Sequence, residues 1–469
     1  MLTQPECLLR KPVMRCPHRN ASRHDRFRKL SKIITQRVAI LSLLFLPTGA
    51  VNAAPKLGID ARKRVFMQVW MRVRDNFYDP GLNGVKWDAI RRRYAPRIDR
   101  ATSDESFYAA LNEMLAELKA SYLAVIPPDA YAPEAAANSK SAEGETGLTA
   151  QLVDGHAVIT RIEPDSSAER AGLRPGFVIT HVGGKPVDMM IGRIKRRKLR
   201  PGMERLYVMV GLNHMLNGAL DSTVKVRVID GADMAKEVAL TRGKHDGQLV
   251  QFAELPPLYA HVETMVLTDN IGYIRFNIFL LPVLQRIKQA IRDMHSAPGI
   301  ILDLRGNPGG VGAMASSIAD ELYGSQSTLG AMKLRQGEIR FAIFPVTDPY
   351  RGVFVLLIDE GSVSTSEVLA GSLQENGRAH VAGRVSPGMV LPSQFEPLPG
   401  GARLQMAIAD FRTPKGLLLE GRGVLPDIPV ELTRRSLLAH TDPTLDAAVD
   451  YIRGNPVPPT TENNISKEN

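Results

Sequence analysis

The chain has 469 residues, 44% of them hydrophobic and 23% charged, which is typical of a globular protein with two or three cores. The formal net charge of +10 invites a nucleic-acid partner, but ten Lys or Arg residues against two acidic residues precede Ala53, which leaves +2 for the rest. The excess basic charge therefore lies in an N-terminal leader. The rest of the chain, which would form the folded protein, is not predicted to bind nucleic acid.

Residues 1–53 have the pattern of an export signal. A basic stretch runs to Arg37, the apolar segment "VAILSLLFLP" follows, and "TGAVNAA" offers small residues for cleavage. The apolar segment is shorter than a membrane span, although a short membrane anchor is the alternative. Cys7 and Cys16 both lie in this leader, so the mature chain would hold no disulfide. We expect export to the periplasm or cell envelope and leave contact with a membrane surface open.

Residues 58–135 are predicted to form a helical segment. Its first stretch places apolar residues at three- and four-residue spacing on one face. These residues are Val65, Phe66, Val69, Trp70 and Val73. In the next stretch Ser103 is a predicted N-cap, and because Ser106 rather than Glu follows three residues later, we expect no full capping box.

Residues 142–245 are predicted to form a small, mainly-β domain. Short β runs alternate with Asp-Gly and Gly-Gly turns, and "SSAERAGL" reads as a short helix between them. The stretch "RAGLRPGFVITHVGGKPV" resembles a PDZ domain, and Gly147, Leu148 and Thr149 lie where that fold keeps its peptide-carboxylate loop. The resemblance implies a peptide or unfolded protein as partner. The basic run "GRIKRRKLRPGMER" is interpreted as a solvated helix face rather than an anionic-surface contact.

Residues 250–455 alternate apolar strands, such as "GIILDLRG" and "VFVLLID", with helices such as "LPVLQRIKQAIRDMH". This alternation predicts an α/β domain. Residues 456–469 are polar and Pro-rich, which predicts a disordered tail.

Two stretches of this α/β region contain candidate active-site residues. "GSVSTSEVLAG" offers Ser364 at a helix start, where free N–H groups favour developing negative charge. The same residues, from Ser364 to Glu367, also form an S/T-x-x-E capping box that needs no catalysis. "GIILDLRGNPGG" ends in Gly309 and Gly310, whose N–H groups can form an anion nest. A hydroxyl at a helix start and a Gly nest together are the parts of an acyl-transfer site.

The ordered motifs "DLRGNPGG", "EGSVSTSEVLAGSLQENGRA" and "TPKGLLLEGRGVLPDIPV" resemble the C-terminal processing (tail-specific) and tricorn-like serine peptidases. The resemblance implies an α/β core with ClpP/crotonase-like strand–helix repeats, an inserted PDZ domain and an N-terminal helical segment. It implies Ser364 as nucleophile and Glu420 as the third polar residue of the site. The oxyanion hole would be the N–H of Thr365 with that of Gly309 or Gly310.

The chain departs from both branches of the family at the general base. The processing branch carries a lysine in T-F-G-K-G, and the matching residue here is Met389. The tricorn-like branch carries a histidine after a serine, and the matching residue here is Tyr122. Loss of a base costs a serine nucleophile several orders of magnitude in rate. The conceivable substitutes are Tyr122 itself, His380 and Lys415.

These observations lead to one function and two alternatives. The first is an exported serine endopeptidase to which the PDZ domain delivers peptide or unfolded protein substrates. The second is an inactive pseudopeptidase acting as a PDZ adaptor. A remoter one is apolar-ligand carriage, as in the interphotoreceptor retinoid-binding proteins, which 6% aromatic content does not support. Scattered histidines and the absence of H-E-x-x-H, phosphate-loop and dinucleotide motifs predict no metal and no cofactor.

Overall fold

A computed structural model describes residues 57–128, 143–244, 247–250 and 258–455. The predicted export signal with Cys7 and Cys16, and the predicted disordered tail, lie outside these ranges. Within them, no helix has both the length and the apolar character needed to cross a membrane.

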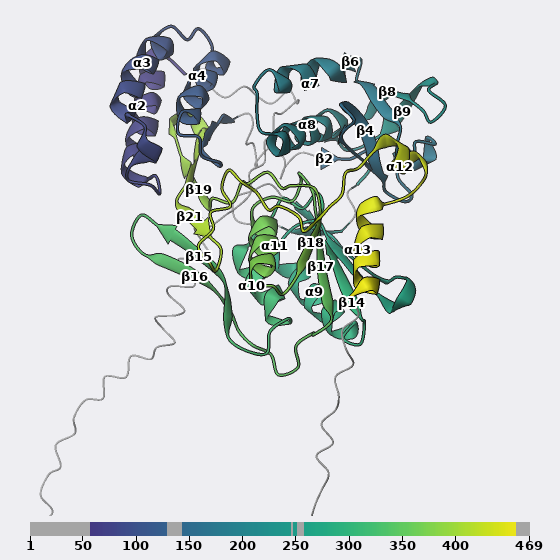
Figure 1. Cartoon of the computed structure of the whole chain (residues 1–469). Helices are drawn as coiled ribbons and strands as arrows, with labels where there is room; N and C mark the ends of the chain where they lie inside the picture. Colours follow the sequence, from purple (N-terminus) through teal and green to yellow (C-terminus); the bar gives the residue numbers. More distant parts are fainter. Residues whose placement is uncertain (1–56, 129–142, 245–246, 251–257, 456–469) are drawn as a thin grey trace, which may run out of the picture. The chain divides into compact units, whose positions relative to one another are not determined.

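Three helices make up the N-terminal segment and lie side by side in Figure 1. They are α2 (Ile59–Asn76), α3 (Trp87–Asp99) and α4 (Asp104–Ala116). The apolar face predicted on α2 is confirmed, because all five of its named residues are buried. The indole N–H groups of Trp70 and Trp87 each donate to the backbone carbonyl of the other, at 3.1 and 3.0 Å, which fixes α2 against the start of α3.

The cap of α4 differs in part from the prediction. The Ser103 hydroxyl accepts from the N–H of Ser106 at 3.1 Å, as expected of an N-cap. The Ser106 hydroxyl also accepts from the N–H of Ser103 at 3.1 Å, so a full capping box is present and the contrary expectation is wrong. A serine hydroxyl can accept this bond as a glutamate does.

A small antiparallel sheet connects the helical segment to the C-terminal part of the chain. Strand β1 (Ala124–Ile126) pairs with β20 (Arg403–Ala407), which also pairs with β19 (Ser393–Pro397). Because β1 begins two residues after Tyr122, this pairing holds Ser121 and Tyr122 beside segments about 270 to 300 positions later in the chain, with which they form hydrogen bonds.

The mainly-β domain is an antiparallel sheet with strand order β3-β4-β5-β8-β9, so β3 is an edge strand. Its strands are β3 (Leu148–Val153), β4 (His156–Ile162), β5 (Val178–Val182), β6 (Lys185–Pro186), β8 (Thr223–Ile229) and β9 (Ala235–Thr241). Its helices are α6 (Ser167–Arg170), α7 (Val187–Lys195) and α8 (Pro201–Leu216), and α8 packs against β3. The predicted Asp-Gly turn is confirmed, because Asp154 and Gly155 have φ of 50° and 81°, as a two-residue hairpin requires.

The basic run of this domain spans the end of α7, a short connection and the start of α8. Residues 195–198 in its middle are exposed, which agrees with the solvated interpretation.

The α/β core is built on a six-stranded sheet with strand order β12-β13-β14-β17-β18-β22, in which only β12 is antiparallel to its neighbour. The strands are β12 (Val262–Val266), β13 (Gly272–Phe276), β14 (Gly299–Asp303), β17 (Val353–Ile358), β18 (His380–Gly383) and β22 (Ile428–Pro429). The predicted α/β alternation is therefore present.

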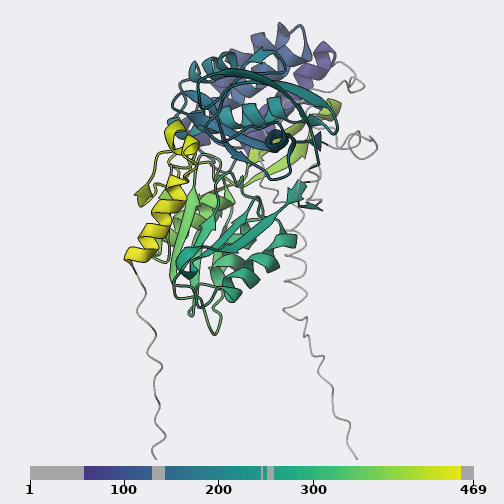
Figure 2. The same ribbon diagram turned by 90° about the vertical axis from the view of Figure 1, so that its right-hand side faces the viewer.

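Helices cover both faces of this sheet. One face packs on α9 (Leu281–Asp293), α10 (Gly312–Asp320) and α11 (Thr365–Glu375). The other packs on α13 (Pro443–Gly454), whose Ala448 and Ile452 contact Ile301, Val355 and Leu357. Figure 2 shows the sheet between the yellow helix α13 and the helices of the other face.

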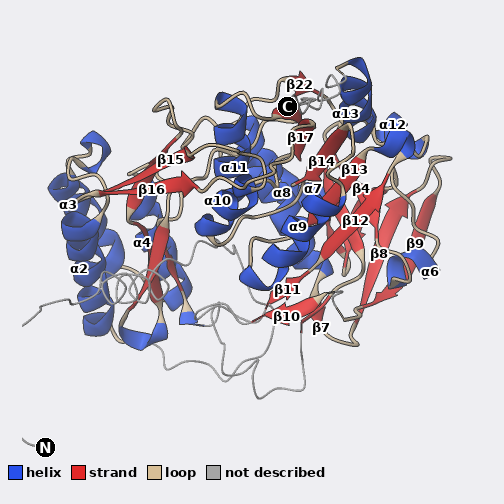
Figure 3. Cartoon of the chain, turned by 90° about the horizontal axis from the view of Figure 1, so that it is seen from below, coloured by secondary structure: helices blue, strands red, loops and turns tan. Residues whose placement is uncertain are grey.

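The chain has further short sheets, and Figure 3 labels their strands β7, β10, β11, β15 and β16. These sheets are a three-stranded sheet, β16-β15-β21, and two short pairs, β2-β7 and β10-β11. Their bounds are β15 (Ser327–Leu334), β16 (Glu338–Ile343), β21 (Ala409–Arg412), β2 (Glu143–Gly144), β7 (Gly218–Ala219), β10 (Gln248–Val250) and β11 (Leu258–Ala260).

Truncation of a core residue on α9 tests the face assigned to this helix. Ile287 is fully buried against the sheet, whereas Leu281 on the same helix is 54% exposed. We expect Ile287→Ala to lower the free energy of unfolding by about 2–5 kcal/mol through lost burial and a cavity. Leu281→Ala should change it by about 0.5 kcal/mol or less. Urea denaturation followed by circular dichroism measures both, and equal losses would contradict the packing.

Candidate active site

The Ser364 residue lies at the N-terminus of α11, after the turn that follows β17. Its φ of 58° and ψ of −115° lie in a region that a residue with a Cβ adopts only when its surroundings enforce it. The backbone N–H of Ser364 is 3.0 Å from Glu367 Oε2 and 3.1 Å from the carbonyl oxygen of Met389. These contacts fix the conformation of the serine, which is only 1% exposed.

The Glu367 carboxylate is the acceptor on which this turn depends. Besides the Ser364 N–H, it accepts from the Ser386 hydroxyl at 2.6 Å and from the N–H groups of Gly388 and Met389 at 2.6 and 2.9 Å. Burial raises the pKa of Glu367 to about 7, although these donors oppose the rise. The capping interaction foreseen in the sequence is therefore present, and the same carboxylate also joins the serine turn to the 386–389 segment.

The turn after β14 lies directly against the serine. Gly309 and Gly310 have φ of 92° and 140°, and a Cβ on Gly309 would lie 2.7 Å from the Val363 carbonyl oxygen and 2.9 Å from the Ser364 Cβ. Only glycine fits this approach. The Thr365 hydroxyl donates to the Gly310 carbonyl at 2.9 Å, which ties the two turns together.

The two glycines differ in what their N–H groups do. The N–H of Gly309 donates to the Asn307 side chain at 2.9 Å, so it is already occupied. Among the described residues, that of Gly310 has no acceptor. The Thr365 N–H belongs to the first turn of α11, where amides lack a helical partner. Of the three N–H groups predicted for the oxyanion hole, those of Gly310 and Thr365 are therefore the two without a hydrogen-bond acceptor among the described residues.

Both positions where the family keeps a base hold groups that cannot serve as one at neutral pH. Burial raises the pKa of the Tyr122 hydroxyl well above its usual value, Glu367 adds to this, and a hydrogen bond with Ser364 opposes it. The Tyr122 hydroxyl therefore stays protonated and donates to the Met389 carbonyl at 3.1 Å. The Met389 side chain is 7% exposed and packs in an apolar cluster with Tyr122, Val363 and Met209.

The carboxylate of Glu420 completes the polar surroundings. It accepts from the N–H and the hydroxyl of Ser121 at 2.9 and 3.0 Å and from the N–H of Val390 at 3.1 Å. Burial raises its pKa. Ser121 was not singled out as a site residue in the sequence, and its position directly before Tyr122 was the one available signal.

The other two candidate bases lie elsewhere. His380 pairs with Val355 near the beginning of β17, whereas Ser364 follows the end of that strand, and its Nε2 is 2.9 Å from the Tyr451 hydroxyl. The exposed Lys415 donates its N–H to Glu375 at the far end of α11, about 16 Å along the helix from Ser364. The structure brings neither residue to the serine.

The predicted peptide-carboxylate turn leads into the edge strand of the mainly-β domain. Gly147 has φ of 76°, and a Cβ there would lie 2.1 Å from the Ser166 Cβ, while Leu148 and Thr149 begin β3. Farther along β3, Gln151 donates to Asp359 Oδ2 at 2.7 Å. The other oxygen of Asp359 accepts from the N–H groups of Gly306 and Gly361, which belong to the two turns of the site.

Three parts of the chain match models of known protein families. Residues 270–430 match peptidase family S41, residues 60–116 match the tricorn protease C1 domain, and residues 158–196 match a PDZ domain. The chain is similar to the carboxyl-terminal-processing proteases of Picosynechococcus sp. (29% identical, covering 88% of this chain and 94% of that protein) and Synechocystis sp. (26%, covering 86% and 90%).

Two solved structures have a similar fold. The photosystem II D1 C-terminal processing protease has a TM-score of 0.54 at 24% identity, over 79% of this chain and 93% of that one. Mature CPAF has a TM-score of 0.57 at 13% identity, over 84% and 96%. At such identities the likeness shows the fold alone.

The buried Glu367 carboxyl predicts a pH-dependent stability difference. With a folded pKa of about 7 against 4.5 for the ordinary group, the folded state holds a proton that the unfolded state releases, so this carboxyl destabilises the fold progressively as pH rises from about 5 to 8. Relative to the wild type, Glu367→Gln should gain on the order of 3 kcal/mol over that range. Urea unfolding of both proteins at the two pH values measures this, and a constant difference would contradict it.

Proposed function

The chain belongs to the C-terminal processing and tricorn-like serine peptidases that carry a PDZ domain, and we propose that it is an exported endopeptidase with Ser364 as its nucleophile. One observation carries the proposal: the strained Ser364 turn is packed against the Gly309–Gly310 turn, with two amides able to receive an oxyanion. A residue held at such a conformation by its surroundings points to function.

In the proposed reaction the Ser364 oxygen attacks a peptide carbonyl, and the amides of Gly310 and Thr365 stabilise the oxyanion. The serine proton passes to a base, which returns it to the leaving amine. The Met389 side chain cannot accept this proton and the Tyr122 hydroxyl keeps its own, so we assign it to Glu367, whose Oε2 lies 3.0 Å from the backbone nitrogen of Ser364 and whose pKa of about 7 suits a general base near neutral pH. In this proposal Glu420 positions the Ser121–Tyr122 segment.

We further propose that the PDZ domain captures an extended segment of a peptide or unfolded protein. Among the described strands β3 lies at the edge of its sheet, the position suited to strand addition, and α8 lies beside it. Export rests on the leader pattern of residues 1–53. The non-basic Met389 and Tyr122 favour a second candidate, an adaptor that binds peptides without cutting them.

Fluorophosphonate labelling tests the nucleophile. We expect the purified protein to be labelled and Ser364→Ala to remain unlabelled, because only an activated serine attacks the probe. The labelling rate should rise between about pH 6 and pH 8 as Glu367 loses its proton. A folded wild type that is not labelled and does not cleave an unfolded protein at any of these pH values would favour the adaptor.

Restoration of the lysine tests the missing base. The apolar surroundings of residue 389 disfavour a charged side chain, so Met389→Lys should carry a largely neutral amine beside Ser364. We expect this variant to be labelled about 100-fold faster than the wild type. Met389→Leu, which keeps the apolar packing, is the control and should match the wild type. An unchanged rate in a folded Met389→Lys protein would mean that the absent lysine does not limit Ser364.

A further inference from the structure

Residues 193–200, called the cationic turn below, connect the end of α7 to the start of α8. Six of these eight residues are Lys or Arg, and none is acidic. They are Arg193, Lys195, Arg196, Arg197, Lys198 and Arg200. Because the chain from Ala53 onward has a net charge of +2, the same chain without these six cations has a net charge of −4. The positive charge of the folded protein is therefore concentrated in this turn.

The protein itself does not neutralise the cationic turn. All six cationic residues are exposed, and among the described residues none of them forms an ion pair. The backbone beneath them is fixed, since the N–H groups of Arg197 and Lys198 donate to carbonyls in the last turn of α7 at 2.9 and 3.0 Å. Arg197 also lies over the Tyr207 ring, 4.7 Å from its centre. Unpaired cations on an ordered backbone favour an anionic partner, because binding needs little further ordering.

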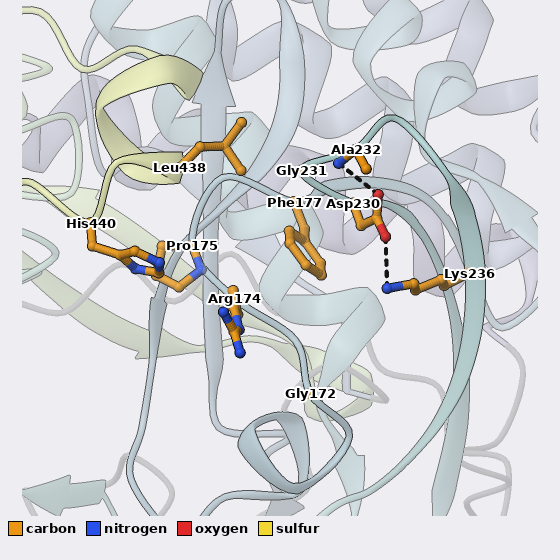
Figure 4. A pocket seen from close by; sticks show the side chains of 10 residues that line it. All are labelled: Gly172, Arg174, Pro175, Phe177, Asp230, Gly231, Ala232, Lys236, Leu438 and His440. Atoms are coloured by element: carbon orange, nitrogen blue, oxygen red, sulfur yellow. Dashed lines mark hydrogen bonds and ion pairs between the residues drawn. The ribbon is translucent and has the colours of Figure 1, made fainter.

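A second group of cations in the PDZ domain is largely neutralised. Arg174 and Lys236 line a pocket of about 360 Å³ that also contacts Leu438, the last residue of α12 (Arg434–Leu438) (Figure 4). Lys236, however, forms an ion pair with the buried Asp230 at 2.6 Å. Arg174 is then the one unpaired Lys or Arg among the described residues that line this pocket. The cationic turn is therefore the stronger attractor for an anionic partner.

The cationic turn lies beside the proposed active site. Nη2 of Arg200 donates to the Pro387 carbonyl at 3.3 Å, and a Cβ on Gly202 would lie 3.3 Å from the Ser386 carbonyl oxygen. The Ser386 hydroxyl is one of the donors to the Glu367 carboxylate. A group bound at the cationic turn is therefore next to a segment that contacts the proposed base.

Helix α8 separates the cationic turn from the predicted peptide-carboxylate turn. It begins directly after Arg200 and packs against β3. Its other end leads into β7, where Gly218 pairs with Gly144 of β2, just before Gly147. The turn at residues 147–149 and the cationic turn therefore lie at opposite ends of α8.

The length of α8 gives the distance between the two turns in residues of bound peptide. Its 16 residues span about 24 Å. An extended chain covers about 3.3 Å per residue, so about seven residues bridge this distance. In a peptide that pairs with β3 and has its carboxylate at residues 147–149, the residues about six to eight positions before the C-terminus therefore reach the cationic turn.

We propose that the cationic turn is a specificity-determining surface that selects substrates with acidic residues about six to eight positions before the C-terminus. A peptide is the partner that the location favours, because the turn adjoins both the helix beside β3 and the segment that contacts Glu367. The proposal rests on the proposed capture of peptides by the PDZ domain, and it does not depend on attack by Ser364.

Selection from a peptide pool tests this preference without catalysis. The pool contains peptides of about twelve residues whose last few positions are randomised and which carry either Glu or Gln about six to eight positions before the C-terminus. The full chain with Ser364→Ala is immobilised, and mass spectrometry measures the retained peptides. We expect the Glu peptides to be retained about tenfold over the Gln peptides at about 50 mM salt, and nearly equally at about 0.5 M, because salt screens exposed charges.

Paired substitutions locate the preference on the protein. Arg196→Gln combined with Lys198→Gln should reduce it about threefold, because each exposed ion pair contributes little by itself. Arg196→Glu combined with Lys198→Glu should reverse it, so that Gln peptides are retained over Glu peptides. The matched control is Arg174→Gln combined with Lys225→Gln, which removes the same charge from exposed positions of the same domain and should leave the preference unchanged.

Three results would contradict the proposal. Equal retention of Glu and Gln peptides is the first, and an equal reduction in the Arg196/Lys198 variant and its matched control is the second. The third is binding to vesicles of equal parts phosphatidylglycerol and phosphatidylcholine that the Arg196/Lys198 variant loses while its peptide preference is unchanged, which would assign the turn to a lipid surface. Retention of neither class of peptide would instead overturn the peptide capture itself, so the two failures are distinguishable.

Discussion

A single buried carboxylate organises this site. Glu367 gathers four donors, from Ser364, Ser386, Gly388 and Met389, in surroundings that disfavour its charge. The donors of Ser386, Gly388 and Met389 would otherwise be buried without an acceptor, which costs more than the net gain of an ordinary hydrogen bond, whereas the Ser364 N–H also lies 3.1 Å from the Met389 carbonyl. The positive φ of Ser364 and the course of the 386–389 segment both follow from satisfying these donors. The scaffold of the site is therefore set by one residue of the α11 N-terminus.

In this chain the backbone framework of the site is present, whereas the two residues at the expected positions of the general base are not basic. The serine turn, the Gly turn and the Glu420 contacts form a complete framework, yet the residues at the two base positions are an apolar side chain and a neutral hydroxyl. Burial explains both. A tyrosine sealed beside two carboxylates holds its proton more tightly than one in water, and a methionine gains from the apolar cluster that a charged lysine would disrupt. The buried Glu367, which contacts the Ser364 backbone, is therefore the proposed base.

Sequence patterns predicted those parts of the molecule that depend on local forces. Apolar runs predicted the strands of the core, the spacing of apolar residues predicted the buried face of α2, and Asp154–Gly155 predicted its hairpin turn. Contacts between distant segments left no such signal. The bond of Gln151 to Asp359 spans 208 positions, and that of Ser121 to Glu420 spans 299. His380 was a candidate because its strand, β18, follows the serine helix. It lies at the beginning of β18, which is parallel to β17, whereas the serine turn follows the end of β17.

The same apolar cluster links the identity of residue 389 to the packing of the PDZ domain on the core. Met389, Val363 and Tyr122 pack with Leu206 and Met209 of α8, so one helix of the PDZ domain is part of the wall around the serine. A methionine adds buried apolar surface to this wall, whereas a lysine must lose its proton or meet water before it fits. Residue 389 therefore acts on two quantities at once: the chemistry available to Ser364 and the stability of the packing between α8 and the core. A methionine at this position therefore favours the burial of Ser364, which is 1% exposed, in place of a side chain able to accept its proton.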